Sequence, residues 1–64
     1  MTARERLALR ALRREHPAAA ARVAEWEDAV EGLVAFDDDG RAVACVHVAW
    51  TWLGVRAVVR WVQA

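Results

Sequence analysis

Residues 42–52 have the sequence AVACVHVAWTW and are apolar at both alternating sets of positions. Side chains of a β-strand point alternately to opposite faces, so this pattern predicts a strand that is covered on both faces. The whole chain has 64 residues, and a domain of about 60 residues buries only about 60% of the surface that its unfolded chain exposes. So short a chain can hardly shelter both faces, and we expect a second copy, another protein or a lipid surface to cover one of them.

Length and charge argue against several classes of function. A chain of this length forms one domain, residues 1–64, without room for a cofactor-sized cleft between lobes. We therefore expect no enzyme activity, no cofactor and no small-molecule substrate. Nine arginines balance nine acidic residues, so the chain has no net field that would attract it to nucleic acid or to an anionic membrane.

Cysteine content and the N-terminus predict the cellular compartment. The single cysteine, Cys45, cannot form an internal disulfide, and the charged N-terminus lacks the apolar segment of a signal peptide. Both features predict a protein of the reducing cytoplasm. All basic residues are arginine and fifteen residues are alanine, a usage typical of a GC-rich bacterial genome. Arginine content is therefore weak evidence for phosphate binding.

The N-terminal half of the chain predicts two helices folded back as a hairpin. Thr2 and Glu5 fit a capping box, in which each side chain accepts a hydrogen bond from the other's backbone N–H, and this predicts a helix over residues 3–15. Pro17 suits the first turn of a second helix, which we expect over residues 17–31. That helix would carry an apolar stripe at helical spacing, formed by Ala19, Val23, Trp26 and Val30.

The C-terminal half predicts three strands joined by short turns. Asp39 and Gly40 form a dipeptide that is typical of hairpin turns, and Gly54 indicates another turn. We expect strands over residues 33–37, 41–50 and 55–62. The predicted fold class is therefore α+β, an N-terminal helical hairpin followed by a three-stranded antiparallel β-meander.

The apolar residues of the last two strands predict a protein interface. Tryptophan is typical of interface anchors because it buries a large area. The candidate interface residues are Val46, Val48, Trp50, Trp52, Val59 and Trp61. The leading hypothesis is a non-catalytic interaction module, a structural, adaptor or regulatory subunit that forms a homo-oligomer or binds another protein. The same tryptophans would also fit a stacking platform for bases or a contact with a membrane surface.

Charge is segregated along the chain, which leaves a second hypothesis open. Six arginines and two glutamates give residues 1–24 a net charge of +4, seven acids give residues 25–40 a charge of −7, and three arginines give residues 41–64 a charge of +3. One flank of the first helix would carry the candidate nucleic-acid contacts Arg6, Arg10, Arg13 and Arg14. Whether the acidic segment 25–39 binds a partner is left open.

Two possible metal sites fail on the number or spacing of their ligands. Cys45 and His47 would share one face of a strand, but a zinc site needs further ligands that the sequence does not place beside them. The triplet at residues 37–39 resembles part of a calcium loop, but Ala35 and Val46 would then occupy the first and last ligand positions. We therefore expect no metal site, a cysteine buried as a small hydrophobe, and a solvated turn.

Overall fold

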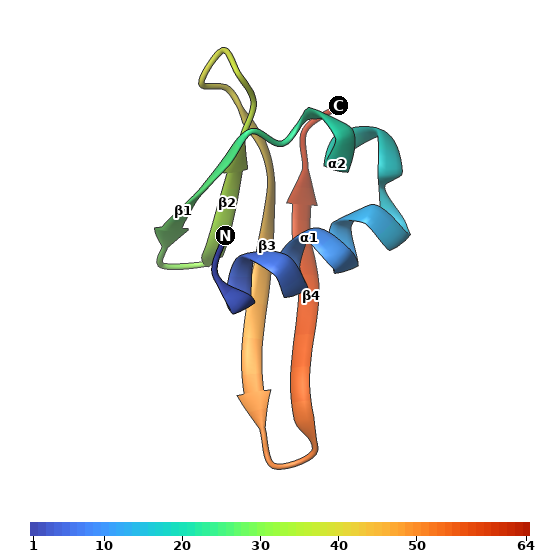
Figure 1. Ribbon diagram of the computed structural model, residues 1–64, viewed down its shortest axis with the longest axis vertical. Helices are drawn as coiled ribbons and strands as arrows, with labels where there is room; N and C mark the ends of the chain where they lie inside the picture. Colours follow the sequence, from blue (N-terminus) through green and yellow to red (C-terminus); the bar gives the residue numbers. More distant parts are fainter.

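Two helices cover one face of a four-stranded antiparallel sheet in the computed structural model, which describes residues 1–64 (Figure 1). In chain order the elements are α1 (Ala3–Glu15), α2 (Pro17–Arg22), β1 (Glu25–Ala29), β2 (Gly32–Phe36), β3 (Ala42–Thr51) and β4 (Gly54–Val62). The strands follow one another in space as they do in sequence, so β1 and β4 are the two outer strands. The α+β class is confirmed, but the sheet has four strands and not the three that were predicted.

The first helix begins where the sequence predicts. The Thr2 hydroxyl accepts a hydrogen bond from the backbone N–H of Glu5 at 3.1 Å, and the Glu5 carboxylate accepts one from the backbone N–H of Thr2 at 2.7 Å. These two bonds satisfy backbone donors that a helix N-terminus otherwise leaves without partners. Pro17 begins α2, as expected of a residue whose fixed φ suits the first turn of a helix.

The prediction of a helix over residues 17–31 is wrong beyond Arg22, and the expected helical hairpin is not confirmed. The chain is extended at Val23, and residues 25–29 form β1, which pairs with β2. Glu25, Trp26 and Glu27 alternate between polar and apolar, which suits an outer strand as well as a helix. The pairing with β2 provides hydrogen bonds across the ladder, and this tertiary contact decides between the two structures.

The three predicted strands agree with β2, β3 and β4 to within one residue at each end. The register places Val46 beside Leu33 on one side and Val59 on the other, and Ala44 beside Ala35. The pairing is irregular between Ala35 and Phe36 and between Cys45 and Val46, so the alternation of faces is locally interrupted there. The sheet is thus a meander with two local irregularities along the first half of β3.

The core lies between the helices and the β2–β4 part of the sheet and is built mainly from small side chains. Its buried residues are Ala8, Ala11, Leu12, Ala19, Ala20, Leu33, Ala35, Val43, Ala44, Val46 and Val48. Alanines on both the helix side and the sheet side let the two layers approach closely. The covered face of β3 is therefore filled by the chain itself.

Gly32, at the start of β2, makes the closest approach to β3. Its φ of 138° is a conformation that L side chains rarely adopt. A Cβ atom at this position would lie 2.6 Å from the carbonyl oxygen of Val46 and 2.9 Å from the Cα of His47. The β1–β2 turn therefore needs glycine both for its backbone angle and for the space beside β3.

Candidate protein-interaction surface

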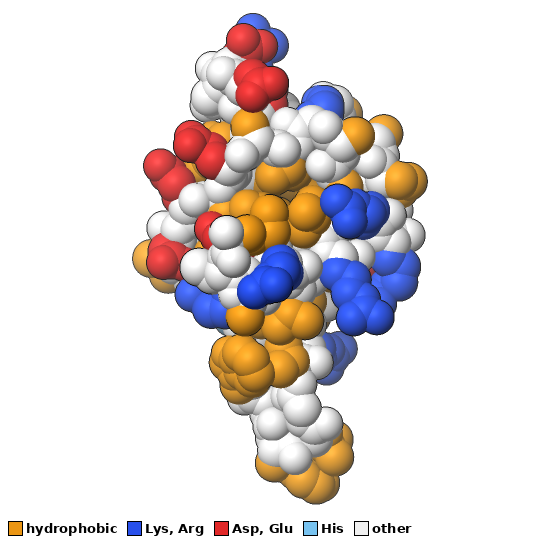
Figure 2. Space-filling view, in the orientation of Figure 1, with side chains coloured by type: hydrophobic (Ala, Val, Ile, Leu, Met, Phe, Trp, Pro, Cys, Tyr) orange, Lys and Arg blue, Asp and Glu red, His pale blue; other side chains and the backbone are white.

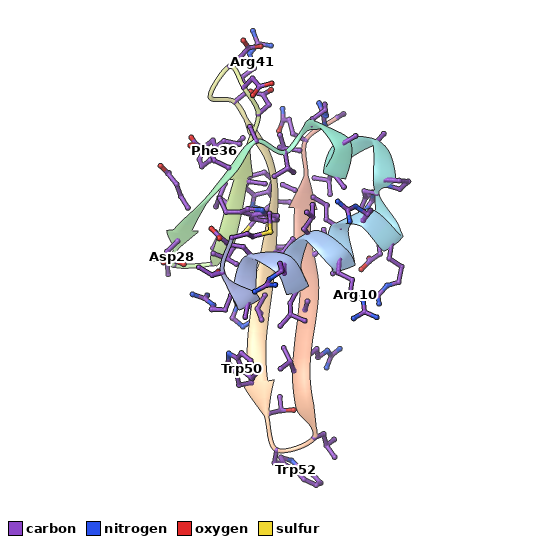
Figure 3. The ribbon with its side chains drawn as sticks, in the orientation of Figure 1. Arg10, Asp28, Phe36, Arg41, Trp50 and Trp52 are labelled. Atoms are coloured by element: carbon purple, nitrogen blue, oxygen red, sulfur yellow. The ribbon has the colours of Figure 1, made fainter.

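The β3–β4 hairpin extends beyond the helices, and its outer end carries the largest exposed apolar side chains (Figures 1 and 2). We call residues 49–55 the arm. Trp50 is 66% exposed, Trp52 92% and Leu53 80%. In Figure 3, Trp50 lies beside β3 and Trp52 at the tip of the hairpin. Such a concentration of apolar surface on a small protein is typical of an interaction site.

Side-chain hydrogen bonds hold the turn of the arm in place. The Thr51 hydroxyl donates to the carbonyl oxygen of Gly54 at 2.8 Å and accepts from the backbone N–H of Leu53 at 3.2 Å. Thr51, the last residue of β3, is also paired with Gly54, the first residue of β4. Tight turns usually hold polar residues or glycine, whereas here Trp52 and Leu53 occupy the two turn positions. The arm therefore presents large apolar side chains on a hydrogen-bonded turn.

The six residues predicted as an interface do not lie together on one surface. Val46 and Val48 are buried in the protein's own core, and Val59 packs against that core. Trp50 and Trp52 lie on the arm, and the alternation of β3 and β4 places Trp61 on the sheet face opposite the helices. Sequence reasoning also missed three exposed apolar residues: Leu53 and Val55 of the arm, and Val58, which the alternation of β4 places on the face opposite the helices. The unbroken uncharged run of residues 42–55 could have indicated the first two.

No helix covers the face of the sheet that carries Cys45, yet Cys45 is completely buried. Trp61 is its partner on β4, and the indole Nε1–H of Trp61 donates to the Glu31 carboxylate at 3.3 Å. This bond joins β4 to the β1–β2 turn across the middle of the sheet. Burial raises the pKa of the Cys45 thiol, the Glu31 carboxylate raises it further, and Arg60 opposes both effects. The inner part of this face is therefore sheltered by the protein's own side chains.

Neither potential metal site is assembled by the fold. No group of three His, Cys, Asp or Glu side chains lies close enough together to hold a metal ion. At the β2–β3 turn the Asp37 carboxylate accepts hydrogen bonds from the backbone N–H groups of Asp39 and Arg41, both at 2.9 Å. Asp37 thus stabilises the turn in the way that aspartate commonly does.

Two arginines of α1 and one of β4 surround an open depression of about 380 Å³. Arg10, Arg14 and Arg56 line it together with the apolar residues Leu7, Ala11, Val55 and Ala57. The structure contains a single ion pair, Arg4 to Asp28 at 3.1 Å. The three arginines of the depression therefore have no carboxylate within 4.0 Å. Arg6 and Arg13, the other two predicted nucleic-acid contacts, are exposed on α1 but do not line the depression. The depression therefore combines apolar residues with three arginines that have no acidic partner.

The two outer strands of the sheet carry opposite charge. β1 contains Glu25, Glu27 and Asp28 and no basic residue, whereas β4 contains Arg56 and Arg60 and no acidic residue. Each outer strand is paired on one side only, so its second row of backbone N–H and C=O groups is available to another chain. The fold thus converts the charge segregation of the sequence into one acidic edge and one basic edge.

Comparisons with known proteins add no functional information. No protein-family model, no curated protein and no solved structure matches the chain. None of the helices is long and apolar enough to span a membrane. The surface features that could bind a partner are the arm, the arginine-lined depression and the two sheet edges.

Proposed function

We propose that this protein is a small non-catalytic interaction module of the cytoplasm, which binds a second copy of itself through the arm and serves as a structural, adaptor or regulatory subunit. One observation carries the proposal: Trp52 and Leu53 occupy a hydrogen-bonded turn, Trp50 lies just before it on β3, and all three side chains remain mostly exposed. Interface energy is commonly concentrated in a few aromatic anchors of this kind.

Charge and area both favour a second copy as the occupant. Residues 42–55 contain no Asp, Glu or Arg, so the arm carries no such charge that would repel a second copy. A tryptophan buries about 150–250 Å², so the two arm tryptophans supply on the order of 300–500 Å² of the ~800 Å² that each partner contributes to a typical interface. The other apolar arm residues, Leu53 and Val55, extend this surface.

Sedimentation across the micromolar range tests the proposal. We expect the native protein to associate, and the double variant Trp50→Ala, Trp52→Ala to associate at least about 30-fold more weakly, as for loss of an interface hot spot. Arg13→Ala, an exposed change on α1 far from the arm in sequence, is the matched control and should associate like the native protein. A native protein that stays monomeric, or a tryptophan variant that associates normally, would contradict the proposal.

The arginine-lined depression supports nucleic-acid binding as a second candidate function. Arg10, Arg14 and Arg56 lack acidic partners within the chain, so they are available to phosphate groups. If this candidate is correct, single-stranded nucleic acid is retained at low salt, and Arg10→Ala with Arg14→Ala removes most of that retention and reduces its salt dependence. Absence of retention by the native protein at low salt excludes this candidate.

A further inference from the structure

We infer that the second copy docks against the arm through its own β1, so that β1 of one copy continues the sheet beside β4 of the other. The inference rests on the proposed function, because it specifies which surface of the partner the arm meets. It also assigns a role to the two oppositely charged edges of the sheet. The partner is thus another copy of this chain, bound edge to edge.

Both edges are suited to strand addition. β1 and β4 are the outer strands, and no other strand pairs with their outer sides. An outer strand of this kind is a ready template for pairing with another chain. In Figure 1 the part of β4 that belongs to the hairpin's outer end continues past α1, so the helices do not accompany it there. The first five residues of β4, 54–58, match β1 in length. Three of them, Val55, Arg56 and Ala57, line the depression beside α1.

Charge distinguishes the three ways of pairing the edges. Two antiparallel copies of β4 centred on Val58 would place Arg56 opposite Arg60 of the second copy, and two copies of β1 centred on Glu27 would place Glu27 opposite itself. Like charges directly opposite each other destabilise a strand pair. β4 beside β1 of another copy brings arginines next to carboxylates, which favours the pair. Charge therefore favours the asymmetric pairing, in which a basic edge meets an acidic edge, over pairs that join two edges of the same sign.

A single antiparallel register pairs the whole of β1 with residues 54–58. It places Gly54 opposite Ala29 of the second copy, Arg56 opposite Glu27 and Val58 opposite Glu25. Arg56 and Glu27 both lie on the sheet face opposite the helices. Arg56 is in register with Ala49 of β3, and Glu27 is in register with Val34, which is in register with Cys45 of β3. Ala49 and Cys45 lie on the same face of β3, because they are four residues apart. The helices of both copies then lie on one face of a continuous sheet.

The same register accounts for other exposed features. Val30, which is 104% exposed, would lie next to Leu53, which is 80% exposed. Trp26 and Asp28 of the second copy would stand opposite Ala57 and Val55. Those two residues line the depression with Arg10 and Arg14. The carboxylate of Asp28, which pairs with Arg4 of its own copy, would therefore also approach these two arginines. Exposed apolar side chains and arginines that have no partner in one copy thus gain partners in two.

An asymmetric contact does not end at two copies. Each copy uses its β4 for one neighbour and its β1 for the other, so a pair of copies still has one free edge of each charge. Growth therefore continues into a chain of subunits or closes into a ring. Because the contact depends on opposite charges at the surface, added salt should weaken it.

Charge reversal tests this pairing. We expect Glu27→Lys and Arg56→Glu each to weaken self-association by about tenfold or more, because each places like charges at the edge contact. Mixing the two variants in equal amounts should restore association. At one contact the introduced lysine of one variant faces the introduced glutamate of the other, and at the next contact the unchanged Arg56 faces the unchanged Glu27. Both positions are exposed, so circular dichroism should show folded variants. Arg13→Glu and Asp38→Lys reverse exposed charges away from the edges and are the matched controls.

The outcomes separate this inference from the proposed function. Association that resists both reversals, fails to return in the mixture or stops at a dimer overturns the edge pairing. If the tryptophan variant then still loses association, the proposed function stands alone. If the reversals act as expected and the tryptophan variant associates normally, the edge pairing stands and the role of the arm tryptophans falls. A native protein that is monomeric throughout overturns both.

Discussion

Val46 and Trp50 lie four residues apart on the same strand, and the alternation of β3 points both side chains to the side of the helices, yet Val46 is 0% and Trp50 66% exposed. The inner half of the hairpin is covered by α1 and α2, whereas the arm continues past them (Figure 1). Both halves are equally apolar in sequence. The difference teaches that the length and position of the covering helices decide which part of an apolar strand becomes core and which remains available to a partner.

The largest expected loss of stability comes from shortening an α1 side chain that covers the inner half of the β3–β4 hairpin. Leu12 belongs to α1 and its side chain is completely buried in the core. Leu12→Ala should lower the free energy of unfolding by about 2–5 kcal/mol, because it removes apolar contacts and leaves a cavity. A domain of this size has a total stability on the order of 3–10 kcal/mol, so the variant should unfold at far lower urea concentration. The exposed arm residue Leu53, changed to alanine, is the control. Equal effects of the two changes would contradict the comparison.

The next effect tests the close approach of the β1–β2 turn to the inner half of β3. Gly32→Ala should cost about 1–3 kcal/mol for the unfavourable backbone angle, with a further cost for the 2.6 Å approach of Cβ to the Val46 carbonyl oxygen. Gly40→Ala has a similar backbone problem, at φ 79°, but no neighbouring atom within 4 Å. Denaturant unfolding should therefore rank Gly32→Ala as clearly the more damaging change. The reverse ranking would show that space beside β3 is not limiting.

A smaller effect concerns the face that no helix covers. Trp61→Ala should lower stability by about 1–2 kcal/mol, because Trp61 is 37% exposed and the rest of its surface is buried. It should also make Cys45 react faster with a thiol reagent, because the loss of cover lowers the raised pKa of the thiol. Trp61→Phe keeps most of the cover and is the control. A Cys45 that stays unreactive in Trp61→Ala would show that Trp61 is not its cover.

The raised pKa of Cys45 also predicts a pH dependence. Below the thiol's ordinary pKa both the folded and the unfolded chain hold the proton, so Cys45 does not alter stability with pH. As pH rises above that value the unfolded chain loses the proton first, and stability falls until the folded thiol also ionises. Cys45→Ala should remove this decline at alkaline pH. An unchanged decline in that variant would assign it to other groups.

The smallest expected effect is on the arm. Trp52 is 92% exposed, so Trp52→Ala should change the free energy of unfolding of the monomer by no more than about 0.5 kcal/mol. Unfolding should be measured at dilution, where association does not contribute. A loss comparable to that of Leu12→Ala would mean that the arm belongs to the core.

Features that depend on neighbouring residues were predictable from the sequence, and those that depend on distant contacts were not. The capping box of Thr2 and Glu5 and the strand over residues 42–51 follow from local hydrogen bonding and from alternation. β1 was missed because Trp26 fits both a helical stripe and a strand, and only the ladder with β2 decides. Likewise, nothing local indicates that α1 covers Val46 and leaves Trp50 exposed, so the predicted interface mixed core residues with surface residues.

The alanines between α1 and the sheet have a consequence for how this protein can vary. Ala8, Ala11, Ala35 and Ala44 are at most 2% exposed, and no residue with a side chain is smaller than alanine. Substitution there therefore almost always adds volume, and each added methyl group must push the helix away from the strands. Very few residue types therefore fit at these four positions, whereas substitutions at the tip of the hairpin leave the packing of the rest of the molecule unchanged.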